Sequence, residues 1–100
     1  MIYVVMCIDK PGVLDQRIAC VPAHRDFLGS YPQDKVKTLL SGPLVQEGGG
    51  DMKGSLFLLE ADNIGEIQAW HDADPMKAAN IWESVSIEAF DKRVDTMSAG

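Results

Sequence analysis

The chain has 100 residues, of which 46% are hydrophobic and 24% are charged. This length fits a single domain, and the composition is too apolar for an intrinsically disordered chain. With 15 acidic against 9 basic residues, the formal net charge is −6. Such a charge gives no attraction to a phosphate backbone or to an anionic membrane surface. We therefore expect a folded acidic domain that binds neither nucleic acid nor membranes.

The start of the chain carries no signal for export. The segment MIYVVMCIDKPG lacks the basic region and the cleavage site of a signal peptide. No apolar run approaches the ~20 residues that span a bilayer. Cys7 and Cys20 have no close spacing and no secretory context, so we interpret both as reduced core thiols. Together these features predict a cytoplasmic protein.

The first elements are a predicted strand and a predicted helix. Residues 2–8 are an apolar run rich in β-branched side chains, and the turn-forming residues 9–12 follow. This strand is apolar on both faces. From residue 13 to about residue 30, apolar side chains recur at helical spacing. Pro22 interrupts this pattern, so the helix either kinks there or begins again with the proline in its first turn.

The middle of the chain predicts a hairpin. Residues 36–45 and 53–61 have the pattern of two strands. The polar loop 46–51 between them contains three consecutive glycines, which favour a tight connection. A strand rather than a helix follows these glycines, so we interpret the loop as a hairpin turn and not as a phosphate-binding loop.

The second half predicts a helix and a final strand. Asn63 is a candidate cap for a second helix, with Glu66 three residues later as in a capping box. This helix should end just before Pro75, because the residue before a proline avoids helical geometry. After a short turn, residues 81–90 alternate as a strand. Glu83 falls on the apolar side of this strand, so it either faces a polar cavity or marks a shift of phase.

The order strand–helix–strand–strand–helix–strand predicts an α+β fold of the ferredoxin-like kind, with both helices on one face of an antiparallel sheet. The first strand is apolar on both sides, so the other face of the sheet also needs a cover. A second copy of the same sheet is the simplest cover, which predicts a homodimer. We assign residues 1–95 to the domain and residues 96–100 to a polar C-terminal tail.

Arg17 and His24 are the first candidate functional residues. They are seven residues apart and share one stripe of the first helix, beside its apolar side. In a functional interpretation, Arg17 recognises an anion and His24 transfers a proton, because imidazole titrates near neutral pH. The alternative is a partly exposed histidine and a solvated arginine, and the spacing alone favours this alternative.

A second group of polar residues, His71, Asp72 and Asp74, lies where the second helix ends. Asp74 can accept a hydrogen bond from a histidine ring and fix its tautomer. Alternatively, Asp74 caps the turn that follows Pro75. The sequence has no His-x-x-x-His or Cys-x-x-Cys spacing and no cofactor motif, so we expect neither a metal nor a cofactor.

Several segments, taken in chain order, resemble the YciI-like (YCII-related) family over nearly the full length. They are Arg17, Val21-Pro22-Ala23-His24, Leu40-Ser41-Gly42-Pro43-Leu44, Trp70-His71-Asp72-Ala73-Asp74-Pro75 and Val85-Ser86-Ile87-Glu88-Ala89-Phe90. The resemblance implies a dimeric α+β barrel with a cavity in each subunit and a paired His24 and Asp74. One related group removes chloride from chlorinated hydroxyquinols, and the wider superfamily includes muconolactone isomerase. Relatives often carry an arginine where this chain has Val21, which weakens the case for a shared anionic substrate.

These observations lead to the hypothesis of an acid–base enzyme of isomerase or lyase type. His24 would move a proton on a small carbonyl, lactone or phenolic compound, Asp74 would orient His24, and Arg17 would hold an anionic oxygen. The other predicted ligand-binding residues are Ser41, Gly42 and Pro43. A second hypothesis is a non-catalytic binding or regulatory dimer that uses the same cavity. A third is a dimeric scaffold whose cavity has no function.

Overall fold

The computed structural model describes residues 1–97. Most of the predicted tail, 96–100, therefore lies outside the described residues. The elements in chain order are β1 (Ile2–Asp9), α1 (Leu14–Ser30), β2 (Lys37–Val45), β3 (Met52–Glu60), α2 (Ile64–Ala73), α3 (Pro75–Ala78) and β4 (Trp82–Phe90). The predicted hairpin is present as β2 and β3, and the predicted turn after Pro75 is the short helix α3.

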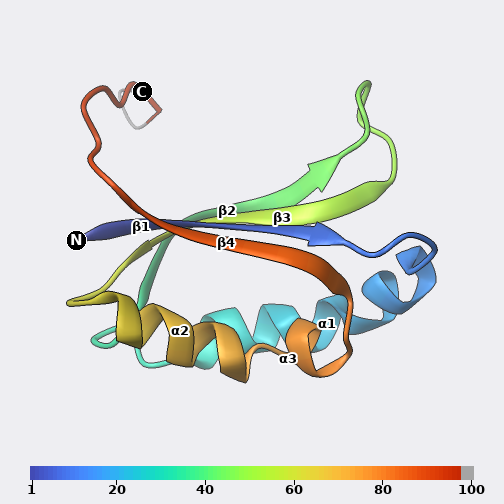
Figure 1. Ribbon diagram of the computed structural model, residues 1–100, viewed down its shortest axis with the longest axis horizontal. Coiled ribbons are helices and arrows are strands. Elements are labelled where there is room, and N and C mark those ends of the chain that lie inside the picture. The colour runs from blue at the N-terminus through green and yellow to red at the C-terminus, as the bar shows by residue number, and fades with distance from the viewer. Residues whose placement is uncertain (98–100) are drawn as a thin grey trace.

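The four strands form one antiparallel sheet in the order β2-β3-β1-β4. The helices cover one face of this sheet, and the segment after β4 leaves on the opposite side (Figure 1). This arrangement confirms the predicted ferredoxin-like α+β fold. Within residues 1–97, no helix is long and apolar enough to cross a membrane.

The two faces of the sheet have different surroundings. On β1, the side chains of Tyr3, Val5 and Cys7 are buried beneath the helices, whereas Met6 and Ile8 on the other side are 38% and 39% exposed. We call this second side the open face. By strand alternation and register, it consists of Ile2, Val4, Met6 and Ile8 of β1 with Leu56 and Leu58 of β3. The sheet thus has one apolar face that the helices cover and one that they leave uncovered, with residues 92–97 beside Ile2 and Leu58 at its edge.

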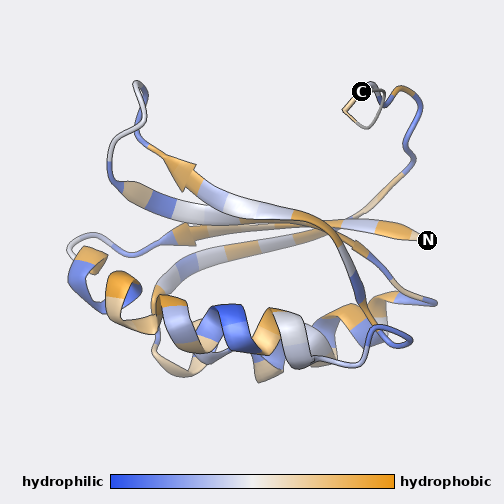
Figure 2. Ribbon diagram, turned by 180° about the vertical axis from the view of Figure 1, so that it is seen from behind, coloured by the Kyte–Doolittle hydropathy of each residue, from blue (hydrophilic) through white to orange (hydrophobic). Residues whose placement is uncertain are grey.

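Helix α1 runs without a break from Leu14 to Ser30, although it contains Pro22. The predicted restart of the helix at the proline is therefore wrong. The helix has mixed polar and apolar segments along its length (Figure 2). Ile18 is 52% exposed although it is apolar, whereas Arg17 is only 2% exposed. The stripe of α1 that faces the sheet therefore begins with a charged residue, Arg17, which forms hydrogen bonds with residues of the sheet.

Local signals in the second half correspond closely to the structure. The side chain of Asn63 accepts a hydrogen bond from the backbone N–H of Glu66 at 3.1 Å, which confirms the predicted cap. In the pairing of β1 with β4, Ile8 lies opposite Ser84 and Asp9 lies opposite Trp82. The register therefore skips Glu83, which is exposed. This residue marks a shift of phase and does not face a polar cavity.

His71 belongs to the packing of α2 and not to the cavity described below. Its ring stacks on that of Trp82, with the ring centroids 5.2 Å apart and the planes inclined by 17°. Burial lowers the pKa of His71 below its ordinary value, and the nearby charge of Lys77 lowers it further. The folded protein therefore holds this imidazole in its neutral form over a wider pH range than the unfolded chain does.

This lowered pKa predicts a loss of stability in mild acid. As the pH falls below the ordinary histidine value of about 6.5, the unfolded chain binds a proton that folded His71 does not. The free energy of unfolding should therefore decrease between about pH 7 and pH 5, and it should decrease less in His71→Gln. Urea denaturation of both proteins at the two pH values measures the difference. Equal pH dependence in the two proteins would contradict the assignment.

Candidate active site

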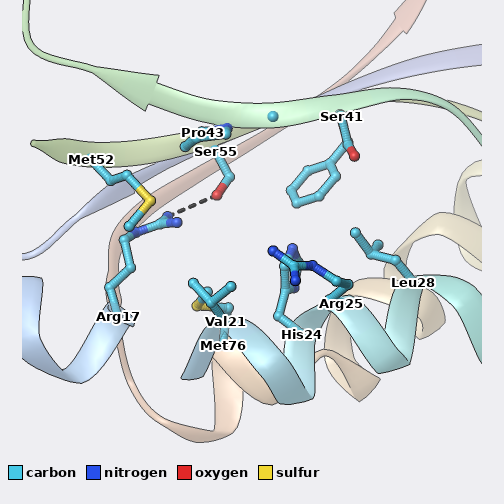
Figure 3. Close-up of a pocket in the computed structure, with 12 residues that line it drawn as sticks. Arg17, Val21, His24, Arg25, Leu28, Ser41, Pro43, Met52, Ser55 and Met76 are labelled. Carbon is cyan, nitrogen blue, oxygen red and sulfur yellow. Dashed lines mark hydrogen bonds between the residues drawn. The ribbon is translucent and has the colours of Figure 1, made fainter. Parts of the chain in front are cut away.

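A cavity of 360 Å³ lies between α1 and the strands β2 and β3 (Figure 3). The helix contributes one stripe, in which each residue lies three or four positions from the next. This stripe consists of Arg17, Val21, His24 and Leu28. The rest of the wall consists of Arg25, Ser41, Gly42, Pro43, Met52, Ser55, Phe57 and Met76. The cavity therefore brings together Arg17, His24 and the three predicted residues of β2.

The structure places His24 and Asp74 in direct contact, although 50 positions separate them in the sequence. The Nδ1 atom of His24, on α1, is 2.9 Å from Oδ1 of Asp74, at the junction of α2 and α3. Asp74 is 1% exposed. The edge of the His24 ring also packs against Phe57, with the ring centroids 5.7 Å apart. These contacts hold the imidazole in one orientation at the cavity wall.

Asp74 fulfils both roles that the sequence left open. Its Oδ1 accepts a hydrogen bond from the backbone N–H of Met76 at 2.9 Å, and so caps α3 while it also contacts His24. Pro75 has no N–H of its own and occupies the first turn of α3. The other carboxylate oxygen of Asp74, Oδ2, is buried without a hydrogen-bond partner among the described residues. The imidazole and one amide are thus the groups that hold this carboxylate.

The hydrogen bond to Asp74 defines the state of the His24 ring. A carboxylate only accepts hydrogen bonds, so Nδ1 of His24 carries the N–H that donates a hydrogen bond to Oδ1 of Asp74. In the neutral ring, Nε2 is then the atom with a free electron pair. Nε2 makes no hydrogen bond to any residue in the range 1–97, and His24 lines the cavity. This nitrogen can therefore accept a proton from a molecule in the cavity.

Arg17 makes a buried ion pair. Its Nε donates to Oδ2 of Asp9 at 2.6 Å, and its Nη2 donates to Oδ1 of the same carboxylate at 2.9 Å. Nη2 also donates to Oγ of Ser55 at 2.8 Å. The interpretation of Arg17 as a solvated residue is therefore wrong. Because Asp9 balances its charge, Arg17 has less capacity to attract an anion than the sequence suggested.

The two cysteines are free thiols. Burial, together with the negative charge of Asp74, raises the pKa of Cys7 to about 12. Burial and Asp74 also raise the pKa of Cys20. A thiol needs a lowered pKa to act as a nucleophile near neutral pH. Neither cysteine is among the residues that line the cavity, and neither has the lowered pKa of a reactive thiol.

Several wall residues were absent from the sequence prediction. Arg25 follows His24 directly, and Phe57 and Ser55 lie on the helix-facing side of β3. Strand alternation could have placed the two β3 residues on one face, but not opposite a particular stretch of α1. Among residues 1–97, no cluster of three histidine, cysteine or acidic side chains is arranged to hold a metal ion.

The fold is that of the dimeric α+β barrel proteins. The dehydrochlorinase TftG of Burkholderia phenoliruptrix AC1100 superposes with a TM-score of 0.82 and 26% identity, over 91% of this chain and 94% of that one. An antibiotic biosynthesis monooxygenase shares the fold at a TM-score of 0.55 and 14% identity, over 94% of this chain and 100% of that one.

The sequence comparisons identify the family. Residues 1–91 match the YCII-related domain, and the chain belongs to this family. Protein YciI of Escherichia coli O6:H1 is 34% identical over 97 residues, which cover 92% of this chain and 98% of that protein. Protein YciI of Shigella flexneri has the same identity and coverage. The resemblance inferred from the ordered segments of the sequence is thereby confirmed.

The buried ion pair generates a prediction about stability. Asp9→Asn removes the charge that balances Arg17, whose side chain is 3% exposed, and should lower the free energy of unfolding by about 3 kcal/mol. Asp91→Asn is the matched control, because it breaks the exposed pair of Asp91 and Arg93. Chemical denaturation should show a change of less than about 0.5 kcal/mol for the control. Similar values for the two variants would contradict a stabilising role for Asp9.

Proposed function

We propose that this protein is an acid–base enzyme of isomerase or lyase type that acts on a small carbonyl, lactone or phenolic compound. The observation that carries the proposal is the hydrogen bond between His24 and the buried Asp74. This bond leaves the second ring nitrogen available to a ligand in the cavity. The cavity volume of 360 Å³ is suited to a compound with a single ring.

In the proposed reaction, Nε2 of His24 accepts a proton from a hydroxyl or an acidic C–H group of the substrate. The carboxylate of Asp74 stabilises the imidazolium that forms and keeps the ring in place. The imidazolium then returns the proton to another atom of the substrate or to a leaving group. The side chains of Ser41 and Pro43, with Gly42 between them, form the β2 wall against which the ligand rests.

The relatives support a small ring compound as the substrate. TftG, at 26% identity, is a 5-chloro-2-hydroxyhydroquinone dehydrochlorinase, and its structure contains 2,5-dihydroxybenzoquinone. The apolar side chains of Val21, Leu28 and Phe57 offer this cavity a surface on which a ring can pack. We therefore choose 5-chloro-2-hydroxyhydroquinone as the first substrate to test, with chloride release as the measurement.

We expect His24→Gln to lower kcat/KM by roughly 100-fold, because general acid–base catalysis contributes at least that factor. Asp74→Asn should cause a loss of similar size, because the amide no longer selects the tautomer with the proton on Nδ1. Steady-state chloride release measures both effects. Thermal melts recorded alongside separate the loss of catalysis from the loss of the α3 cap.

The chain provides a matched control in its second histidine. His71 does not line this cavity, so His71→Gln should retain the wild-type rate at neutral pH. A wild-type rate in His24→Gln would contradict the proposed role of His24. Turnover lost equally in His24→Gln and His71→Gln would show that the effect arises from folding and not from catalysis.

The second candidate function is a non-catalytic small-molecule-binding or regulatory module. The observation that favours it is the pairing of Arg17 with Asp9, which leaves the cavity with less charge for stabilising a reaction intermediate. Tight binding of a ring compound without any turnover would support this alternative. Turnover that depends on His24 would exclude it.

We also propose that the protein is a cytoplasmic homodimer in which two sheets meet through their open faces. The exposed apolar side chains of Met6 and Ile8 support this proposal, because an apolar sheet face is rarely left in water. The fold of the chain, shared with dimeric α+β barrel proteins, supports it as well. Two free cysteines are compatible with a reducing compartment.

The dimer proposal predicts different effects for two apolar-to-charged substitutions. Met6→Lys puts a charge at the centre of the open face and should convert the dimer into monomers. Ile18→Lys is the matched control, because Ile18 is more exposed than Met6 but lies on α1, away from this face. Sedimentation velocity measures the mass of each variant. A monomeric wild-type protein, or equal masses for the two variants, would contradict the proposal.

A further inference from the structure

The charged side chains that line the cavity have the opposite sign to the net charge of the chain. The chain as a whole carries a formal charge of −6. In the part of the chain that the structure describes, however, the ionisable side chains lining the cavity are Arg17, His24 and Arg25, and no aspartate or glutamate lines it. Asp9 balances the charge of Arg17, and Asp74 lies against His24, so the attraction of this cavity for anions depends on Arg25.

The two arginines of the cavity differ in their partners. Arg17 is buried, and both oxygens of Asp9 accept hydrogen bonds from its guanidinium group. Arg25 makes no ion pair and no side-chain hydrogen bond with any residue in the range 1–97. Arg25 is therefore the arginine of this cavity whose charge the protein leaves unbalanced.

The position of Arg25 makes this charge available to a ligand. Arg25 follows His24 on α1 and is exposed, so it stands at the mouth of the cavity, whereas Arg17 and Ser55 lie at a buried end. Figure 3 shows its guanidinium group directed toward the space between the helix and the sheet, on the same side of α1 as His24. A guanidinium group presents several N–H donors in one plane and matches the two oxygens of a carboxylate.

The remainder of the wall indicates the body of the ligand. Leu28 and Val21 lie on the same helix as Arg25, and Phe57 faces them from β3. A ring or an unsaturated chain can pack against these apolar side chains while a charged group at its end reaches Arg25. A molecule held in this way also passes the His24 ring, since that ring packs against Phe57.

We infer that the cavity binds a small organic anion with an apolar, unsaturated body, and that Arg25 is the specificity-determining residue that binds its charged group. This inference rests on the proposed function, because it names the substrate class of the same cavity. It differs from the expectation for Arg17, which the sequence had assigned to the anionic group. Arg17 instead forms a buried part of the wall, neutralised by Asp9.

The test uses the full chain and two probes that differ in charge, 4-hydroxybenzoate and 4-hydroxybenzamide. Binding is followed by titration calorimetry and by the NMR signals of the His24 ring. The wild-type protein should bind the carboxylate at least roughly tenfold more tightly than the neutral amide. Arg25→Gln should weaken carboxylate binding by roughly tenfold and leave amide binding unchanged, while Arg25→Lys should retain most of the preference.

Arg93→Gln is the matched control, because it removes the same charge from the segment after β4, outside the cavity wall. This variant should bind both probes as the wild type does. Added sodium chloride should weaken carboxylate binding more in the wild type than in Arg25→Gln. Equal wild-type affinity for the two probes, absence of carboxylate binding, or equal losses in Arg25→Gln and Arg93→Gln would each overturn the inference.

The same titrations separate this inference from the proposed catalytic function. His24→Gln retains Arg25, so it should still prefer the carboxylate to the amide even if it has no turnover. An anion preference without any His24-dependent reaction would therefore support the inference and contradict the acid–base proposal. A His24-dependent reaction with no preference for anions would support catalysis and overturn the role of Arg25.

Discussion

The hydrogen bond between His24 and Asp74 joins the two parts of the helical layer. One oxygen of Asp74 contacts an imidazole on α1 and the first free amide of α3, so a single atom links these two elements. A carboxylate that is 1% exposed depends on such partners, because an unpaired buried charge is strongly unfavourable. The orientation of the imidazole therefore depends on the same carboxylate that caps α3.

A second buried pair, between Arg17 and Asp9, distinguishes the two arginines of α1. Arg17 is held by Asp9 at the end of β1 and by Ser55 on β3, and it anchors the start of the helix to the sheet. Arg25, two turns later, has no such anchor within residues 1–97. The first arginine belongs to the architecture, and the second is available to a ligand. The two arginines differ because Arg17 is buried and paired with the carboxylate of Asp9, whereas Arg25 is exposed.

The sheet connects the ligand site with the proposed assembly. Along β3, Ser55 and Phe57 face the cavity, while Leu56 and Leu58 belong to the open face. Successive side chains of a strand point to opposite sides, so each of these side chains faces either the cavity or the open face. A dimer formed through the open face would thus support the back of the strands that form the cavity wall, without occupying the cavity.

The sequence by itself determined the elements, their order and the fold, because the signals involved are local. The β-branched apolar run of residues 2–8, the cap at Asn63 and the stop before Pro75 each act within a few residues. The spacing of the residues left the partner of Asp74 open and the family resemblance implied His24, but only the tertiary structure shows the contact itself and the neutralisation of Arg17 by Asp9. The reason is that partners far apart in the chain meet only after α1 has packed on the sheet. Spacing along the sequence records which face a residue occupies, but not what lies opposite.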